Sequence, residues 1–423
     1  MTRRDWFGLG IAAPALAAPA LMASAAPEQP CPTAPHRTKT AAVATVYRYN
    51  SHADVLIGRL LAGYSANATW APSQTQVVSL HAVQVPANSD MSRDLAVRNG
   101  FKIYPSIRET LTLGGQSLAV DGVVFIGEHG DYPSNDVGQI LYPRYELFSQ
   151  IMDVYEESGR SVPTFFDKHL SYSWEKADAL YRRAKKIGFP FMAGSSIPLT
   201  IRRPALDPPL DIPITEAVTV GYGPADAYGF HTLEGLQCMV ERRKGGETGI
   251  ASVQWIEGPD IWTWRDSAQG AWAKPLLEEA LRLQPLPASP PIEVQAKQPV
   301  LFVLNYRDGL KAAALVLTQN AAGFSTVLRV KGQERLLSVA FVIGEPGLLH
   351  PLEHRPLPNW DGIGRCVDHF LATGEAPNPV ERTLLTTGAL AFCFQSKREK
   401  KLVETPELQV RYRGPVSSWF QTS

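Results

Sequence analysis

Apolar and polar positions follow two different patterns along the chain, and the change between them divides it into two parts. Up to about residue 196, short apolar runs such as VATVYRY, VDGVVFIG and PFMAGSS alternate with segments whose apolar residues recur at helical spacing, such as ADVLIGRLLAGY and WEKADALYRRAKKIG. Uninterrupted apolar runs are typical of buried parallel strands, and strands that alternate with helices indicate a doubly wound sheet. We therefore predict an α/β domain of the Rossmann-like type over residues 43–196.

The pattern changes after about Ile197. Segments such as AVTVGYG, GIASVQWIEG, KAAALVLTQ and FSTVLRVKG indicate strands separated by turns, with one strong helix, HTLEGLQCMVERRKGG, among them and two more near the end. This pattern predicts an open, mainly antiparallel sheet with helices on one face over residues 197–423, an α+β domain for substrate binding or oligomerisation. By analogy alone, the free face of such a sheet could pair with a second subunit in a homo-oligomer.

The first residues of the chain have the character of an export signal. Arg3 and Arg4 precede an Ala-rich apolar run, and Ala23-Ser24-Ala25 offers a cleavage site of small residues, a pattern that resembles a twin-arginine signal over residues 1–26. Two prolines interrupt the run, which disfavours the alternative of a stable membrane anchor. Residues 27–42, rich in Pro and Ala, are predicted to be a tether. We expect a periplasmic protein with no membrane span after the signal is removed.

Composition narrows the class of partner. The 423 residues are 44% hydrophobic, enough for two domains with their own cores, and 41 basic residues balance 41 acidic ones. With a formal net charge of zero, the protein has no overall electrostatic attraction for nucleic acid or for an anionic membrane, so the expected partner is a small molecule. The cysteines show no Cys-x-x-Cys pair, so no zinc ribbon is indicated.

The turn between the first predicted strand and helix carries no glycine. A Rossmann-like domain normally needs glycines there, because a Cβ blocks the phosphates of a dinucleotide or forces a left-handed backbone. This turn instead offers a set of polar and aromatic side chains, Tyr47, Arg48, Tyr49 and His52, with Asn50 between them. They could stack on a ring and pair with an anion, or they could fill the space that a dinucleotide takes in other Rossmann-like domains and leave nothing bound.

Polar residues also follow two later strands, where an open α/β sheet places its ligand crevice. The segment GEHGDY contributes Glu128, His129 and Asp131, and FFDKHLSYSW contributes Asp167, Lys168 and His169. The oxygen and nitrogen atoms of Glu128, His129, Asp167, His169 and His231 could hold a divalent metal. No spacing among them is diagnostic, so no metal is expected, and loop residues of this kind are often only solvated.

Strand geometry separates two uses of the DKH segment. In an extended strand, Asp167 and His169 point one way and Lys168 the other. Lys168 facing the crevice would favour hydride or proton transfer, whereas Asp167 and His169 facing it together would favour an acid–base pair or a metal.

Five segments in their order resemble the glucose–fructose oxidoreductase, inositol dehydrogenase and rhizopine-catabolism (Gfo/Idh/MocA) family. They span most of the chain after the tether: RDLAVRNGFKIYPSIRETL, VDGVVFIGEHGDYP, VPTFFDKHLSYSWEKADALYRRAKKIGFPFMAG, YGFHTLEGLQCMVERRKGG and APNPVERTLLTTGALAFCFQSKREKKLVE. The resemblance implies that the first domain binds NAD or NADP. Both sequence marks of the dinucleotide are missing, however: the glycine-rich turn, and an acidic residue near His81 and Gln84.

The resemblance also assigns residues. Lys168 matches the lysine of the family's EKP motif, with Asp167 for Glu and His169 for Pro, and His231 matches its helix histidine. By resemblance, the lysine sits beside the nicotinamide and helps move the substrate hydroxyl proton. The family's aspartate four residues before the histidine falls on Ala227, with Asp226 one place off, which puts a Lys–Asp–His relay in question. The alternatives are a surface lysine and a histidine at the edge of a buried helix stripe.

These observations give three hypotheses. The first is an exported oxidoreductase-like enzyme for a sugar or polyol, with Lys168, His231 and Asp167 catalytic and NAD(P) binding unusual or lost. In this hypothesis Tyr47, Tyr49, Asn50, His52, Glu128 and His129 contact the cofactor, and His169, Asp131, Arg202 and Tyr228 the substrate. The second is a non-redox lyase, hydratase or hydrolase on the same scaffold, with or without a metal. The third is a non-catalytic carbohydrate-binding protein.

Overall fold

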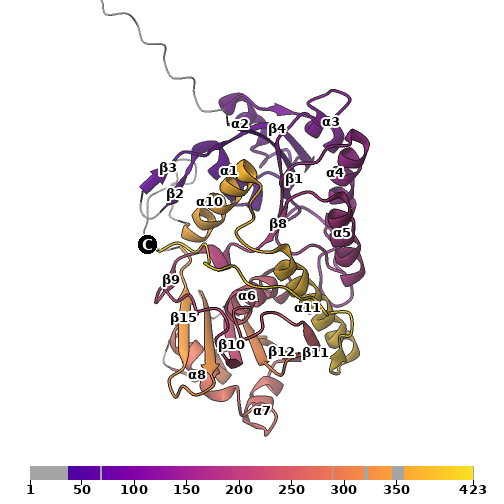
Figure 1. Ribbon diagram of the computed structural model, residues 1–423. Helices are drawn as coiled ribbons and strands as arrows, with labels where there is room; N and C mark the ends of the chain where they lie inside the picture. Colours follow the sequence, from indigo (N-terminus) through magenta and orange to yellow (C-terminus); the bar gives the residue numbers. More distant parts are fainter. Residues whose placement is uncertain (1–36, 67–68, 288, 319–322, 345–356, 423) are drawn as a thin grey trace, which may run out of the picture. The chain divides into compact units, whose positions relative to one another are not determined.

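The computed structural model describes residues 37–66, 69–287, 289–318, 323–344 and 357–422 (Figure 1). The predicted export signal lies outside these residues, as does most of the predicted tether. The first strand begins at Thr38, so residues 38–42, which were predicted to belong to the tether, are part of the sheet. Among the described helices, none combines the length and the apolar character that crossing a bilayer requires.

The first sheet has six parallel strands in the order β5-β4-β1-β6-β7-β8, as predicted for a doubly wound domain. Its strands are β1 (Thr38–Val46), β4 (Thr75–Gln84), β5 (Lys102–Ile103), β6 (Gly122–Ile126), β7 (Thr164–Asp167) and β8 (Phe191–Gly194). Its helices are α1 (His52–Ala62), α2 (Ser92–Asn99), α3 (Ile107–Thr112), α4 (Arg144–Ser158) and α5 (Trp174–Ile187). A small hairpin, β2 (Tyr64–Ala66) and β3 (Thr69–Ala71), was not predicted.

Local sequence explains where these helices begin and end. The Ser51 hydroxyl accepts the Asp54 N–H at the start of α1, and the Ser173 hydroxyl accepts the Lys176 N–H at the start of α5. Gly188 ends α5 with φ 82°, a left-handed conformation that glycine adopts without a Cβ clash.

The second sheet has eight strands in the order β16-β11-β12-β13-β10-β14-β15-β9. They are β9 (Arg202–Arg203), β10 (Ile214–Tyr222), β11 (Ile250–Glu257), β12 (Val300–Tyr306), β13 (Lys311–Leu317), β14 (Phe324–Val330), β15 (Leu337–Phe341) and β16 (Val403–Glu404). All the pairs are antiparallel except β10 with β13, which confirms a mainly antiparallel sheet. A short 3₁₀ turn, Ile197–Leu199, follows β8.

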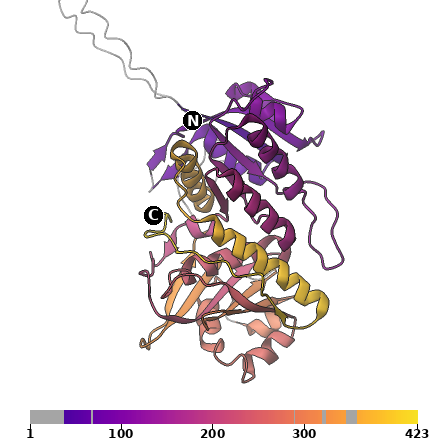
Figure 2. The same ribbon diagram turned by 45° about the vertical axis from the view of Figure 1, so that its right-hand side comes forward.

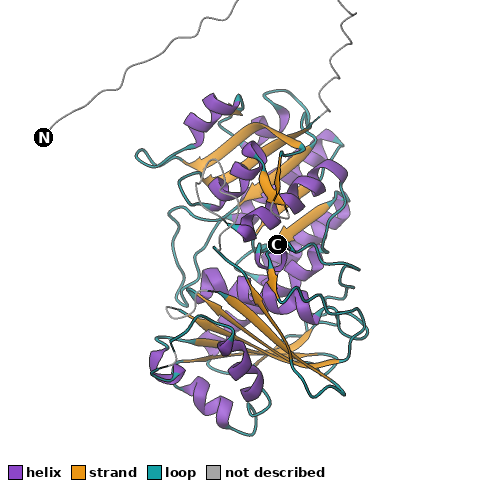
Figure 3. Cartoon of the chain, turned by 90° about the vertical axis from the view of Figure 1, so that its left-hand side faces the viewer, coloured by secondary structure: helices purple, strands orange, loops and turns teal. Residues whose placement is uncertain are grey.

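The prediction that helices cover only one face of the second sheet is wrong. Helices α6 (Ala225–Val240) and α11 (Val380–Glu399) lie on the face toward the first sheet, and α7 (Asp260–Asp266) and α8 (Lys274–Arg282) lie on the other (Figure 3). A further short helix, α9, spans Ile292–Gln295. The strands are apolar on both faces: Val218 and Val220 pack against α8, while Ala217 packs toward the first sheet. The continuous runs VTV and AAALVL already show this pattern, which marks two-sided burial rather than a free face.

Helix α10 (Pro358–Thr373) lies late in the sequence but packs against the first sheet and α1 (Figure 2). Its Ile363, Val367 and Phe370 share a core cluster with β1 and β6, although residues 358–373 fall in the part of the chain predicted to form the second domain. One continuous core also runs from β6 and β7 through α5 and α11 to β12. The two sheets are therefore held together by shared packing.

Asp368 of α10 fixes the turn that leads into β4. Its carboxylate accepts hydrogen bonds from the Tyr64 hydroxyl (2.9 Å), the Ser73 hydroxyl (2.7 Å), and the backbone N–H groups of Gln74 (2.8 Å) and Thr75 (3.0 Å). Asp368 is fully buried, so without it these donors would lack a partner in the interior.

Replacing this carboxylate is expected to destabilise the fold strongly. Asp368→Ala should lower the free energy of unfolding by on the order of 3 kcal/mol, because hydrogen bonds to a charged acceptor are lost and buried donors stay unsatisfied. The measurement is the midpoint of chemical denaturation. Asp136→Ala, which removes an exposed partner of Arg398, is the control and should leave the midpoint unchanged. Equal midpoints for the two variants would contradict this role of Asp368.

Candidate functional site

The carboxyl ends of β1, β6, β7 and β8 meet at one edge of the first sheet. The strand order reverses between β1 and β6, which is where a doubly wound sheet forms its ligand crevice. The N-terminal turns of α6, from the second half of the chain, approach the same edge. Together they bring most of the predicted site residues into one buried cluster, here called the polar cluster: His52, Glu128, His129, Asp167, Lys168, His169 and His231.

His52 and Asp167 form the closest pair in the polar cluster. His52 is the first residue of α1, and its Nδ1 lies 2.6 Å from Oδ2 of Asp167, with both side chains buried. A carboxylate accepts hydrogen bonds, so the Nδ1–H of His52 donates to Asp167, and in the neutral form of the ring Nε2 is then the acceptor. This is the arrangement in which a carboxylate orients an imidazole as a general base.

Two further imidazoles and an indole surround the His52 ring. The His129 ring centroid lies 5.0 Å away, that of His231 6.4 Å away, and that of Trp360 in α10 4.6 Å away. Burial, together with the nearby His52, lowers the pKa of His129 to about 3. Burial and the charge of Lys168 hold the pKa of His231 well below its ordinary value. His129 and His231 are therefore neutral at physiological pH and can exchange protons without first losing a charge.

Lys168 adopts a left-handed backbone, with φ 70°, and its N–H donates to the carbonyl of Gly194 (3.1 Å). The side chain donates from Nζ to the carbonyl of Ala227 (2.8 Å) and lies 3.4 Å from Oε1 of Glu128. Non-glycine residues rarely adopt this conformation, and it is often found at functional sites. It also breaks the strand alternation, so the predicted choice between Lys168 and the Asp167–His169 pair is wrong: all three reach the polar cluster.

Arg144 completes the charge balance of the polar cluster. Its guanidinium pairs with the Glu128 carboxylate and donates to Nε2 of His169 (2.8 Å). Burial alone would raise the pKa of Glu128, but Lys168 and Arg144 outweigh it and hold that pKa well below the ordinary value. Burial and the Arg144 charge lower the pKa of His169, and because arginine only donates, the proton of the neutral ring is on Nδ1.

Ser195, at the end of β8, orients His231. Its hydroxyl accepts the N–H of Ile197 (3.0 Å) and lies 2.6 Å from Nδ1 of His231. When the hydroxyl proton donates to Nδ1, the neutral His231 ring carries its own proton on Nε2. The neutral forms of His52 and His231 then present opposite tautomers, with an acceptor at Nε2 in His52 and a donor at Nε2 in His231.

Sequence reasoning missed Arg144, Ser195 and Trp360. Ser195 lies at the end of the predicted strand PFMAGSS and directly after the observed one, so the strand-end rule that selected Glu128 and Asp167 could also have selected it. Arg144 opens α4 and is fully buried there, but a single arginine at a helix start gives no distinctive signal. Trp360 comes from α10, and nothing local predicts that this helix returns to the first sheet.

Several other predicted site residues lie outside the polar cluster. Tyr47 is fully buried in the apolar core of the first sheet, and Tyr49 is 57% exposed. Arg202 is buried, with its guanidinium 4.3 Å from the Phe420 ring centroid, and it donates to the carbonyls of Pro198 and Leu206 (both 3.0 Å). It therefore anchors backbone, and the prediction that it contacts substrate is wrong.

Tyr228 does lie at the rim of the polar cluster, half-buried. Its ring centroid is 5.8 Å from Nζ of Lys168 and 5.7 Å from the His231 ring. Tyr228 thus contacts both residues to which the resemblance assigned roles, and Lys168 and His231 meet in one place.

The predicted metal ligands are engaged with one another or with neighbouring side chains. Asp167 pairs with His52, His169 with Arg144, His231 with Ser195, and Glu128 with Arg144 and Lys168. Within the described residues, no group of three or more His, Cys, Asp or Glu side chains is arranged to hold a metal ion.

The turn between β1 and α1 does not fit a dinucleotide in the ordinary position. Asp54, in the first turn of α1, accepts the N–H of Asn50 (2.8 Å), so a carboxylate lies at the helix end that would otherwise attract a pyrophosphate. At the end of β4, the Gln84 amide binds both backbone polar groups of Asp131 (3.0 and 2.8 Å). Gln84 therefore stands near the position where an acidic residue would bind a ribose, and it connects β4 to the loop after β6 instead.

Comparison with known proteins shows the fold. No protein-family model matches the chain, and no curated protein matches it either. Among solved structures, myo-inositol 2-dehydrogenase from Lactobacillus plantarum matches with TM-score 0.51 and 11% identity, over 87% of this chain and 99% of that one. A myo-inositol dehydrogenase from Corynebacterium glutamicum matches with TM-score 0.51 and 13% identity, over 87% of this chain and 99% of that one. GenD2 from gentamicin A biosynthesis, in complex with NAD, matches with TM-score 0.53 and 14% identity, over 87% of this chain and 96% of that one. The chain therefore has the two-domain fold of these oxidoreductases, as the resemblance implied.

The lowered pKa of His129 predicts a specific pH dependence of stability. Between pH 6.5 and about 3, the unfolded chain binds a proton at this histidine that the folded chain does not bind, so the contribution to stability is present above pH 6.5 and is lost as the pH falls. His129→Gln should therefore reduce the slope of unfolding free energy against pH by about 1.4 kcal/mol per pH unit between pH 5 and 6. The measurement is denaturation at several pH values. Parallel curves for parent and variant would show that His129 is not held neutral.

Proposed function

We propose that the protein is an exported enzyme that acts on a hydroxylated small molecule, a sugar or polyol, by proton transfer at the polar cluster. The observation that carries this proposal is the buried His52–Asp167 pair, set beside His231 and Lys168. Buried titratable groups with strongly lowered pKa values, gathered at a sheet crevice, are typical of acid–base catalysis.

The substrate class is supported by the proteins that share the fold. Solved structures with the same two-domain architecture are named as inositol dehydrogenases, and inositols are cyclic polyols. Export is supported by the twin-arginine pattern at Arg3 and Arg4.

The geometry assigns complementary roles to three residues. His52, oriented by Asp167, accepts a proton at Nε2 from a carbon or hydroxyl of the substrate. The Lys168 ammonium stabilises the negative charge that develops on a substrate oxygen. His231, oriented by Ser195, donates its Nε2 proton to a leaving hydroxyl. Loss of water from a polyol derivative, or its addition, then needs no redox cofactor, which is the chemistry of a lyase or hydratase.

Three half-buried side chains, His129, Tyr228 and Trp360, lie next to the buried groups of the polar cluster, and we infer that a substrate passes them. Lys168 is 2% exposed and His231 7%, so a substrate enters when these rim side chains move. Such a closed site excludes water from the reacting groups and strengthens the electrostatic interactions inside it.

A second candidate is an oxidoreductase that binds NAD or NADP outside the ordinary position. It is supported by the convergence of Lys168, which the resemblance places beside a nicotinamide, with His231, which matches the family's helix histidine. It is also supported by the NAD complex among the proteins of like fold. If a dinucleotide binds here, it would accept or supply a hydride. Lys168 and His231 would then hold and move the proton of the substrate hydroxyl.

The two candidate functions differ in the source of the hydrogen that is transferred to carbon: solvent in proton transfer, and a nicotinamide or the substrate itself in hydride transfer. In D₂O, proton transfer by His52 should introduce deuterium at a carbon of the product without added NAD(P), because the abstracted proton exchanges with solvent. The measurement is NMR of inositols, sugar acids and sugars incubated with the protein, with and without NAD or NADP. Turnover that requires NAD(P) and leaves carbon-bound hydrogen unexchanged would instead support the oxidoreductase.

Variants of the central pair should abolish turnover while leaving the fold intact. His52→Gln is expected to lower kcat by about 10²–10⁴-fold, the usual contribution of a general base, and Asp167→Asn should also lower kcat because it removes the group that orients His52. Glu157→Gln, which alters an exposed pair with Arg108, is the control and should be fully active. Full activity of both His52→Gln and Asp167→Asn would eliminate this mechanism. Ligand binding without turnover by the parent would support a non-catalytic carbohydrate-binding protein.

Gentle purification followed by native mass spectrometry tests the cofactor directly. Because Asp54 already lies at the N-terminus of α1, the parent should carry no dinucleotide and should show no rise in melting temperature with 1 mM NAD or NADP, a concentration about 1,000 times a Kd of about 1 μM. A retained mass of NAD or NADP would support the second candidate.

A further inference from the structure

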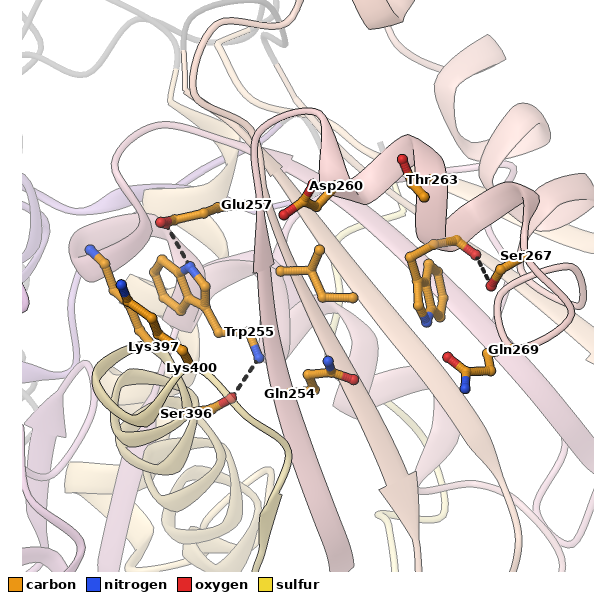
Figure 4. A pocket seen from close by; sticks show the side chains of 12 residues that line it. Gln254, Trp255, Glu257, Asp260, Thr263, Ser267, Gln269, Ser396, Lys397 and Lys400 are labelled. Carbon is orange, nitrogen blue, oxygen red and sulfur yellow. Dashed lines mark hydrogen bonds between the residues drawn. The ribbon is translucent and has the colours of Figure 1, made fainter.

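A trough lies beside β11, outside the polar cluster. It consists of two adjoining cavities of about 510 and 490 Å³, and Trp255, Glu257 and Lys397 line both of them. In the first cavity, Lys397 and Lys400 at the end of α11 lie on one side, and Asp260 and Thr263 of α7 lie on the other (Figure 4). No residue of the polar cluster lines either cavity.

The walls of the first cavity are aromatic and apolar. Trp255, Ile256 and Trp264 line it, and Trp264 is half-buried, so part of its indole remains accessible. The Trp255 ring is held in place, because its indole N–H donates to Glu257 (2.8 Å) and Lys397 Nζ lies 4.9 Å from the ring centroid. Fixed indole rings offer large apolar faces at low entropic cost, which suit the C–H face of a sugar ring.

The rim of the first cavity is polar but carries no net charge. Two carboxylates, two ammonium groups and two amides line it: Glu257, Asp260, Lys397, Lys400, Gln254 and Gln269. Carboxylates accept, ammonium groups donate and amides do both, which matches hydroxyl groups that donate and accept in turn. Because the two carboxylates are matched by two ammonium groups, the rim has no net attraction for an anion or a cation, and this combination favours a neutral, polyhydroxylated ligand.

The second cavity extends toward the candidate site. It is lined by Asp226 and Val137, and Asp226 precedes Ala227, whose carbonyl accepts the Lys168 ammonium. The carbonyl of Val137 accepts from Lys397 (2.9 Å), so one lysine fixes the junction of the two cavities. Each cavity is within the size range of a small-molecule site, and the two together give room for a chain of rings.

We propose that this trough is a second binding site, for a neutral oligosaccharide chain, with Trp264 as a stacking platform and with hydrogen bonds from Gln254, Gln269 and Lys400. This proposal does not depend on the reaction proposed for the polar cluster, because the trough is proposed to bind the oligosaccharide without reacting with it.

Calorimetric titration with three neutral hexasaccharides, maltohexaose, cellohexaose and chitohexaose, tests this proposal. At least one of them should bind, and Trp264→Ala should weaken that binding about tenfold or more, because the stacking surface is removed. The matched control is Trp262→Ala, in the same helix but outside the lining of both cavities, which should bind like the parent. Gln269→Ala, at an exposed lining position, should also weaken binding and serves if Trp264→Ala does not fold.

His52→Gln separates this proposal from the proposed catalytic function, because it should bind the hexasaccharide as tightly as the parent does. Loss of binding in His52→Gln with retention in Trp264→Ala and Gln269→Ala would place the chain in the polar cluster and overturn the proposal. Absence of binding by all three hexasaccharides, or tighter binding of an anionic heparin hexasaccharide, would overturn it too.

Discussion

The structure depends on the balance of charge buried at the carboxyl edge of the first sheet. Glu128 lies in the interior with Lys168 and Arg144, where an unpaired carboxylate would cost several kcal/mol. This requirement fixes the loop after β6, the end of β7 and the start of α4 relative to one another. The left-handed backbone of Lys168 follows from it, since that conformation lets the ammonium reach Glu128 and the carbonyl of Ala227 at once. His129, His169 and His231 stay neutral in the same environment, and His231 is the proton donor of the proposed chemistry.

The glycine-free turn has a coherent explanation in this environment. In a dinucleotide-binding protein the space at the start of α1 belongs to a pyrophosphate. Here Asp54 supplies a negative charge at the helix end, and His52 turns its ring toward Asp167 at the end of β7. Side chains of the chain itself therefore lie at this turn, and the crevice carries proton donors and acceptors on the fold that the compared oxidoreductases share. The fold alone would suggest hydride transfer, whereas the residues at the crevice favour proton transfer.

Much of the fold could be predicted from the sequence, because β1, β6 and β8 are mostly apolar and α5 has a clear apolar face. The strand-end rule also brought Glu128, Asp167 and Lys168 to one edge. The features that were not predicted are mostly those that depend on contacts between residues far apart in the sequence. The return of α10, which carries Trp360 to the His52 ring, has no local signal, and the short helices α7 and α8 were overlooked in a segment with many turn residues. Strand alternation failed at Lys168 because the tertiary pairing with Glu128 and the bridge to Gly194 override the extended conformation.

The central claim is that Asp167 fixes a proton on Nδ1 of His52, whereas Ser195 leaves the proton of His231 on Nε2. Long-range ¹H–¹⁵N correlation spectra of protein labelled with ¹⁵N-histidine measure this directly at neutral pH. The account predicts a proton on Nδ1 and none on Nε2 for His52, and the reverse for His231, with the His52 pattern changed in Asp167→Asn and the His231 pattern changed in Ser195→Ala. The same tautomer in both rings, or spectra insensitive to these two substitutions, would contradict it.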